Sequence, residues 1–86
     1  MEDGKEHMAA PMRIVDTSNM DYEFGPGQKI QFELTKGRHY KSTFFSKKPL
    51  YPLATTLEKG DKVVVKGWIE LYGRDEYIQV YGLRKL

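Results

Sequence analysis

Residues 29–35, KIQFELT, constrain the fold more than any other short segment, because apolar and polar side chains alternate strictly along them. Ile30, Phe32 and Leu34 fall on one face of an extended chain, and the polar residues between them fall on the other. A period of two predicts a β-strand with one buried face and one face in solvent. The chain is therefore expected to build a sheet over a core.

Four further strands are predicted from related patterns, at residues 12–19, 38–46, 61–73 and 76–86. A Gly-Pro-Gly sequence inside residues 21–28 indicates a loop there. The inward apolar row of the fourth predicted strand consists of Val63, Val65, Ile69 and Leu71. Gly67 interrupts this row, and a glycine inside a strand pattern indicates a β-bulge or a sharp bend.

One short helix is predicted within residues 49–60, between the third and fourth strands. Leu53 and Leu57 lie four residues apart, and Pro52 takes a position that a first helical turn tolerates. Gly60 provides a C-terminal stop. Three strands, a short helix and two more strands form the order of the OB-fold, a five-stranded Greek-key barrel. The predicted fold class is therefore all-β.

Length and composition fit one small domain that folds without disulfide bonds. The 86 residues suffice for a single domain, which we place at 12–86, and the aperiodic segment 1–11 predicts a disordered tail. The absence of cysteine excludes disulfide bonds and thiolate zinc sites. It also favours a reducing compartment, cytoplasmic or, in a eukaryote, nuclear. No apolar run approaches the roughly 18–20 residues of a membrane span, so no membrane partner is expected.

The sequence gives little support for catalysis. His7 and His39 have no metal-ligand partners at a suitable spacing, and neither a phosphate-binding glycine loop nor a nucleophile elbow is present. Asp75 and Glu76 are adjacent, so their side chains point apart instead of forming an acid–base pair. We therefore expect a protein that is not an enzyme and that has no catalytic residue, no metal ligand and no cofactor.

Positive charge and aromatic rings are concentrated in residues 36–48, KGRHYKSTFFSKK. This stretch holds five basic residues, one histidine and three aromatic residues, and it contains no acidic residue. By contrast, residues 1–8 hold three acids and one lysine, a net charge of −2, whereas the rest of the chain holds thirteen basic and nine acidic residues, a net charge of +4. Such local charge is what an anionic partner would meet.

Two faces alternate along this stretch: one carries Tyr40, Ser42 and Phe44, and the other carries Lys41, Thr43 and Phe45. Burial of an unpaired ammonium group costs several kcal/mol, so Lys41 is expected to face solvent together with Phe45. A ring on a basic face can stack on a nucleic-acid base, which contributes about 1–3 kcal/mol. The alternative is a solvated edge with one exposed aromatic residue.

The second half of the chain resembles OB domains of the anticodon-binding and replication protein A type. In those domains, as in LEKGDKVVVKGWIELYGRDEYIQVYGLRKL, a helix ends on a leucine, the chain turns at Gly-Asp, and a valine-rich strand passes through a glycine before a final Ile-x-Val strand. YKSTFFSK resembles their third strand. The resemblance implies that Lys41 and Phe45 contact single-stranded DNA. IELYGRDEYIQV also resembles the N-terminal OB domain of the exonuclease VII large subunit.

OB domains bind their ligands on the second and third strands and on the loops that join strands one to two and four to five. The candidate nucleic-acid-binding residues are Lys36, Arg38, Lys41, Thr43, Phe45, Lys47, Lys48, Gln31, Arg74 and Tyr77. The basic residues are expected to contact phosphates, Phe45 and Tyr77 to stack on bases, and Gln31 to bond to a base edge. Two alternatives stay open: that Glu33 simply pairs with Lys41, and that the neighbouring acids neutralise Arg74.

Four other aromatic residues are left outside this site. Tyr22 and Phe24 are expected to plug one end of the barrel, and Trp68 and Tyr72 to cover its back or to contact a partner. The predicted partner is single-stranded nucleic acid, with DNA favoured over RNA. The alternative is a protein-interaction or structural OB domain that uses Trp68 and Tyr72 as its contact. Either domain could belong to a replication, repair or RNA-processing assembly with other domains or subunits.

Overall fold

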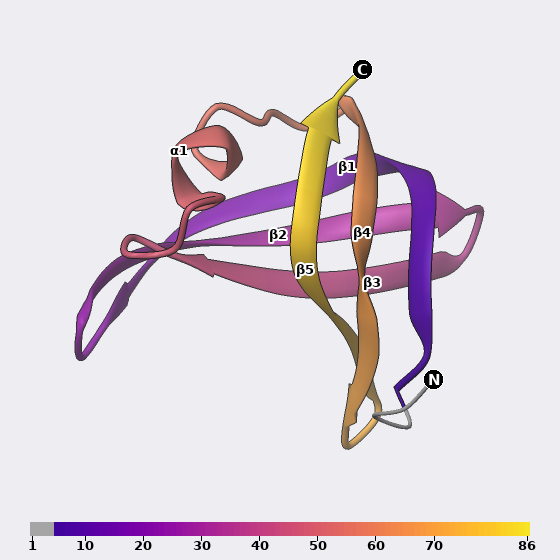
Figure 1. Cartoon of the computed structure of the whole chain (residues 1–86), viewed down its shortest axis with the longest axis horizontal. Helices are drawn as coiled ribbons and strands as arrows, with labels where there is room; N and C mark the ends of the chain where they lie inside the picture. Colours follow the sequence, from indigo (N-terminus) through magenta and orange to yellow (C-terminus); the bar gives the residue numbers. More distant parts are fainter. Residues whose placement is uncertain (1–4) are drawn as a thin grey trace.

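A computed structural model describes residues 5–86, which form five strands and one short helix (Figure 1). These are β1 (His7–Tyr22), β2 (Gly25–Thr35), β3 (Arg38–Phe45), α1 (Tyr51–Ala54), β4 (Lys62–Tyr72) and β5 (Asp75–Lys85). The strands close into a barrel in the order β1-β2-β3-β5-β4, and β4 pairs back to β1. This confirms the predicted all-β OB barrel with a short helix between β3 and β4. Over the described range, no helix is long and apolar enough to cross a membrane.

The core is built from the inward rows that the alternation predicted. Its buried residues are Met12, Ile14, Ile30, Phe32, Tyr40, Phe44, Ala54, Leu57, Val63, Val65 and Ile78. On β3, Phe44 is 2% exposed and Ser42 is also buried, whereas Lys41 and Phe45 lie on the outer face and are only partly buried. The predicted assignment of the two faces of β3 is therefore confirmed.

The predicted disordered tail is wrong for residues 7–11, which form the first part of β1. This part pairs antiparallel with β4, from His7 opposite Trp68 to Arg13 opposite Lys62. The Ala-Ala-Pro sequence carries a weak strand signal by itself. These residues become a strand because β4 offers them a free row of backbone hydrogen-bonding groups, and the pairing closes the barrel. Residues 1–4 of the predicted tail lie outside the described residues.

The predicted loop at 21–28 is instead the tip of a long hairpin between β1 and β2, which projects from the barrel in Figure 1. Pairing continues to Tyr22 opposite Gly25, and the turn occupies the two residues between them. Gly25 has a backbone φ of 130°, a conformation that residues with a Cβ rarely adopt. The glycines that indicated a loop therefore serve to shape a tight hairpin end.

Two further expectations change at the ends of elements. The helix is four residues long, and Leu57, which lies after it, still reaches the core. The inward row of β4 ends before Leu71, which is 71% exposed. The β4–β5 hairpin continues beyond the barrel, as Figure 1 shows, so a residue of the inward row near its tip has no core to enter.

Gly67 marks the predicted irregularity, because the β4–β5 register shifts between Lys66 and Gly67. A Cβ at Gly67 would meet the backbone carbonyl oxygen of Gln79 and would lie 2.9 Å from Cγ1 of Ile78. Close approach of two backbones, and not a positive φ, is therefore what requires glycine here.

We expect Gly67→Ala to lower the free energy of unfolding by about 1–3 kcal/mol, because the added methyl group overpacks a site bounded by backbone. Gly82→Ala is the matched control, since the nearest atom to its Cβ would be Cβ of Lys66, at 3.2 Å, and not a backbone atom. Urea unfolding of both variants measures the difference. Equal midpoints for Gly67→Ala and the unmodified chain would show that the strands can separate there at little cost.

Candidate nucleic-acid interface

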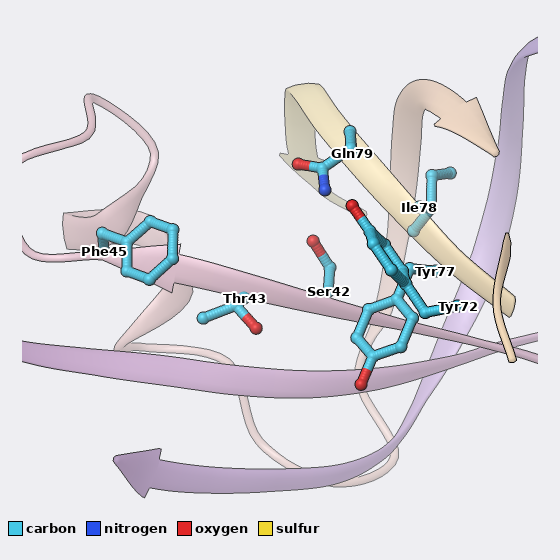
Figure 2. A pocket seen from close by; sticks show the side chains of 7 residues that line it. All are labelled: Ser42, Thr43, Phe45, Tyr72, Tyr77, Ile78 and Gln79. Carbon is cyan, nitrogen blue, oxygen red and sulfur yellow. The ribbon is translucent and has the colours of Figure 1, made fainter. Parts of the chain in front are cut away.

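An open cavity of about 420 Å³ lies where β3 and β5 meet, and we call it the β3–β5 groove (Figure 2). Its lining residues are Ser42, Thr43, Phe45, Tyr72, Tyr77, Ile78 and Gln79. In the described chain, the parallel β3–β5 ladder consists of one pair, Lys41 opposite Tyr77. The pairing does not continue beyond this pair, which leaves room for a groove whose lining includes the buried Ser42 and Ile78.

Two tyrosines bound one end of the groove. The rings of Tyr72 and Tyr77 meet edge to face, with centroids 5.2 Å apart. Tyr72 was expected to cover the back of the barrel or to contact a partner, and the structure places it at the groove instead of the back. The β4–β5 hairpin extends past the barrel and brings the outer face of β4 beside the outer face of β5, so that both rings reach the groove.

Glu70 fixes the position of Tyr72. The phenol of Tyr72 donates a hydrogen bond to Oε2 of Glu70, and Nε1 of Trp68 donates to Oε1 over 2.8 Å. The bond to Glu70 raises the pKa of Tyr72, and the bonds from Tyr72 and then Trp68 lower the pKa of Glu70. At neutral pH the phenol is therefore neutral and the carboxylate is charged.

Phe45 bounds the other end of the groove, where it contacts the tip of the β1–β2 hairpin. Its ring packs edge-on against Phe24 (4.9 Å between centroids) and Tyr22 (5.2 Å). Lys48 places its ammonium group 4.9 Å from the centroid of Phe45. Phe24 is 53% exposed, so the expectation that Tyr22 and Phe24 plug the barrel is wrong. This cluster could not be predicted from the sequence. Gly25-Pro26-Gly27 indicates a loop, and a loop leaves the position of Phe24 relative to β3 undefined.

The cations of β3 are paired with acids from the β4–β5 hairpin. Lys41 lies 3.3 Å from Asp75, and Arg38 lies 3.3 Å from Glu76. Asp75 and Glu76 therefore engage the cations of β3, and Arg74 is exposed in the turn. An anionic ligand on β3 would compete with these two carboxylates.

The pairing of Glu33 with Lys41, one of the alternatives left open, does not occur. Glu33 accepts hydrogen bonds from Arg13 over 2.7 Å and from His39 over 3.0 Å. These bonds, with that from Arg13 the stronger cause, lower the pKa of Glu33. Lys41 is therefore paired with Asp75 and not with Glu33.

The lowered pKa of Glu33 predicts a loss of stability in acid. A carboxyl group whose pKa is lower in the folded state stabilises the fold above its unfolded pKa, and this contribution disappears as pH falls through the folded pKa. We expect the melting temperature of Glu33→Gln to decrease less steeply than that of the unmodified chain as pH falls below the ordinary range of glutamate titration. Thermal unfolding over a series of pH values tests this. If the melting temperature of the variant fell with pH as steeply as that of the unmodified chain, other carboxyl groups would account for the loss of stability in acid.

The remaining predicted residues divide between two sides of β3. Thr43 lies inside the β3–β5 groove. On the other side, Gln31 stands opposite Lys41 and lines a second hollow of about 320 Å³ together with Lys29. Lys47 and Lys48 follow β3 and are exposed. Lys36 is separate from the groove, in the β2–β3 turn, where it lines a different hollow beside Arg13 and Lys62. Among residues 5–86, no group of three or more side chains is arranged to hold a metal ion.

The comparisons with known proteins agree with this architecture. No protein-family model and no curated protein sequence matches the chain. Among solved structures, the small single-stranded DNA-binding protein from Streptomyces coelicolor superimposes with a TM-score of 0.72, over 96% of this chain and 93% of that one. The two sequences are 17% identical, so the likeness establishes a shared fold. By fold, the chain is a five-stranded OB barrel.

Proposed function

We propose that this chain is a module that binds single-stranded nucleic acid, DNA in preference to RNA, along the β3–β5 groove. The observation that carries the proposal is an open groove with aromatic rings at both ends and cations beside it. Rings offer stacking surfaces to bases of any sequence, and Lys and Arg neutralise the phosphates. The chain acts by binding and performs no chemistry of its own.

Two likenesses support DNA as the ligand. The neighbour from Streptomyces coelicolor, which has the same fold, is a single-stranded DNA-binding protein. The sequence YKSTFFSK on β3 resembles the third strand of OB domains of the replication protein A type, in which the positions of Lys41 and Phe45 contact single-stranded DNA. The structure holds both side chains on the outer face, where a ligand can reach them.

The groove suggests how a strand would lie. One base would stack on Phe45 and another on Tyr77, while Thr43 and Gln79 between these rings offer hydrogen bonds to base edges. Phosphates would lie toward Lys41, Arg38 and Lys48. Since carboxylates already pair with Lys41 and Arg38, binding would exchange two intramolecular ion pairs for contacts to phosphate.

Titration of fluorescently labelled oligothymidine at two salt concentrations tests the proposal. We expect binding that weakens as salt rises, because each phosphate contact releases a counterion. Oligouridine of equal length compares RNA with DNA. Absence of binding at low salt to either strand would exclude the proposed function.

Removing a competing carboxylate should strengthen binding. We expect Asp75→Asn to raise the affinity for oligothymidine by roughly two- to fivefold at low salt, the range of an exposed ion pair, because Lys41 no longer has to leave its partner. Glu58→Gln is the control, since it removes the same charge from an exposed site in the connection between α1 and β4. An equal gain in both variants would indicate a general charge effect and not release of Lys41.

A further inference from the structure

A second aromatic cluster lies on the outer face next to the β3–β5 groove. It consists of His7 on β1, Trp68 on β4 and Tyr81 on β5, and we call it the Trp68 platform. Trp68 and Tyr81 are stacked, with centroids 6.0 Å apart and an interplanar angle of 28°. The His7 ring lies 5.8 Å from each of them. Tyr81 is 52% exposed, so the platform has a face open to a ligand.

Tyr81 lies at the β-bulge beside Gly67. In the β4–β5 register, Lys66 stands opposite Gly82 and Gly67 opposite Val80, so Tyr81 is the extra residue on β5. The alternation along β5 places Tyr81 on the outer face, since Ile78 and Val80 face inward, and the bulge leaves it without a residue opposite on β4. On this face the ring of Tyr81 meets Trp68.

The platform is continuous with the β3–β5 groove. Thr43 and Gln79 line the groove and also line an adjoining cavity of about 270 Å³. Tyr81 and Lys48 line this second cavity, so it leads from the groove to the platform. Gln79 also stands directly opposite Trp68 in the β4–β5 ladder.

The charges around the platform suit a nucleic acid whose bases face the protein. The ammonium group of Lys5 lies 4.2 Å from the centroid of Trp68, and Lys66 is exposed on the same face of β4. Glu70 places one carboxylate beside the rings, and it already accepts hydrogen bonds from Trp68 and Tyr72. A phosphate would avoid Glu70, whereas a base could stack on the exposed ring and keep its phosphate toward the lysines.

We infer that the Trp68 platform extends the binding track, so that a strand filling the groove continues over Gln79 and stacks further bases on Tyr81 and Trp68. The inference rests on the proposed function and adds a second stacking site to it. Four residues along β5 separate Tyr77 from Tyr81, roughly 13 Å in a strand, so the extended track needs a longer ligand than the groove alone. Single OB domains occupy about 4–16 nucleotides, a range that includes both cases.

The fluorescence of Trp68 tests this directly, because it is the sole tryptophan in the chain. Labelled oligothymidines of about 4 and about 12 nucleotides, the lower and upper parts of the usual range, would be titrated by anisotropy while tryptophan emission is recorded. We expect both strands to bind, the longer one more tightly. The longer strand is expected to quench Trp68, and the shorter one to leave its emission nearly unchanged.

Tyr81→Ala separates the platform from the groove without removing the tryptophan. We expect it to weaken binding of the longer strand by about fivefold or more, the lower limit for one stacked base, and to leave binding of the shorter strand unchanged. Leu71→Ala is the matched control, since it removes another large exposed side chain from the same hairpin, 71% exposed against 52% for Tyr81. It should affect neither strand.

Several outcomes would overturn the inference. If the longer strand binds no more tightly and Trp68 emission stays constant, the track ends at the groove and the proposed function stands alone. Equal quenching by both strands would make the platform the primary site instead of an extension. Unchanged affinities in Tyr81→Ala would show that the cluster is not part of the track. If neither strand binds at low salt, the proposed function fails together with the extension.

Discussion

Replacement of Phe44 by alanine is expected to lower the free energy of unfolding by about 3–5 kcal/mol, which is a large part of the stability of a domain this small. Phe44 is 2% exposed and packs edge-on against Phe32, with ring centroids 6.4 Å apart. Its removal leaves a cavity that the closed barrel can collapse only in part. Urea unfolding should show a lower midpoint with a similar slope.

Phe45→Ala is the matched control for this experiment. The two phenylalanines are adjacent on β3 and undergo the same chemical change, but Phe45 lies on the outer face and contacts the hairpin tip instead of the core. Its replacement should cost much less stability than that of Phe44. If Phe45→Ala unfolded the domain and Phe44→Ala did not, the two faces of β3 would have to be exchanged.

The second large effect is on binding. Under the proposed function, Phe45→Ala should weaken binding to oligothymidine by about 1–3 kcal/mol through the loss of one stacked base. The slope of log K against log salt should remain almost unchanged, because stacking releases no counterions. Fluorescence titration over a series of salt concentrations gives both quantities for each variant.

Lys41→Ala, unlike Phe45→Ala, should change the slope of log K against log salt. Removal of one phosphate contact is expected to reduce the steepness of the salt slope by about 0.7, the value for one contact to a single strand. Both variants should remain folded, since Lys41 and Phe45 lie on the outer face. If Phe45→Ala reduced the slope as much as Lys41→Ala does, the ring would act by positioning a cation such as Lys48 and not by stacking.

The alternation of residues along single strands was sufficient to predict much of this molecule. The inward row of Ile30 and Phe32, the two faces of β3 and the irregularity at Gly67 all follow from local sequence patterns. They could be predicted because strand geometry sends neighbouring side chains to opposite faces, and because an unpaired ammonium group is costly to bury. The all-β class and the element order followed from the same patterns.

Pairings between distant segments could not be predicted in this way, and they complete the candidate site. Residues 7–11 became a strand through their pairing with β4, and Tyr72 reached the groove because the β4–β5 hairpin extends beyond the barrel. The pairing of β2 with β3 likewise brings Tyr22 and Phe24 into contact with Phe45. The sequence alone determined which face each side chain takes on its own strand. Closure of the barrel decided which faces meet, because backbone hydrogen bonds between strands depend on register and not on the local order of residues.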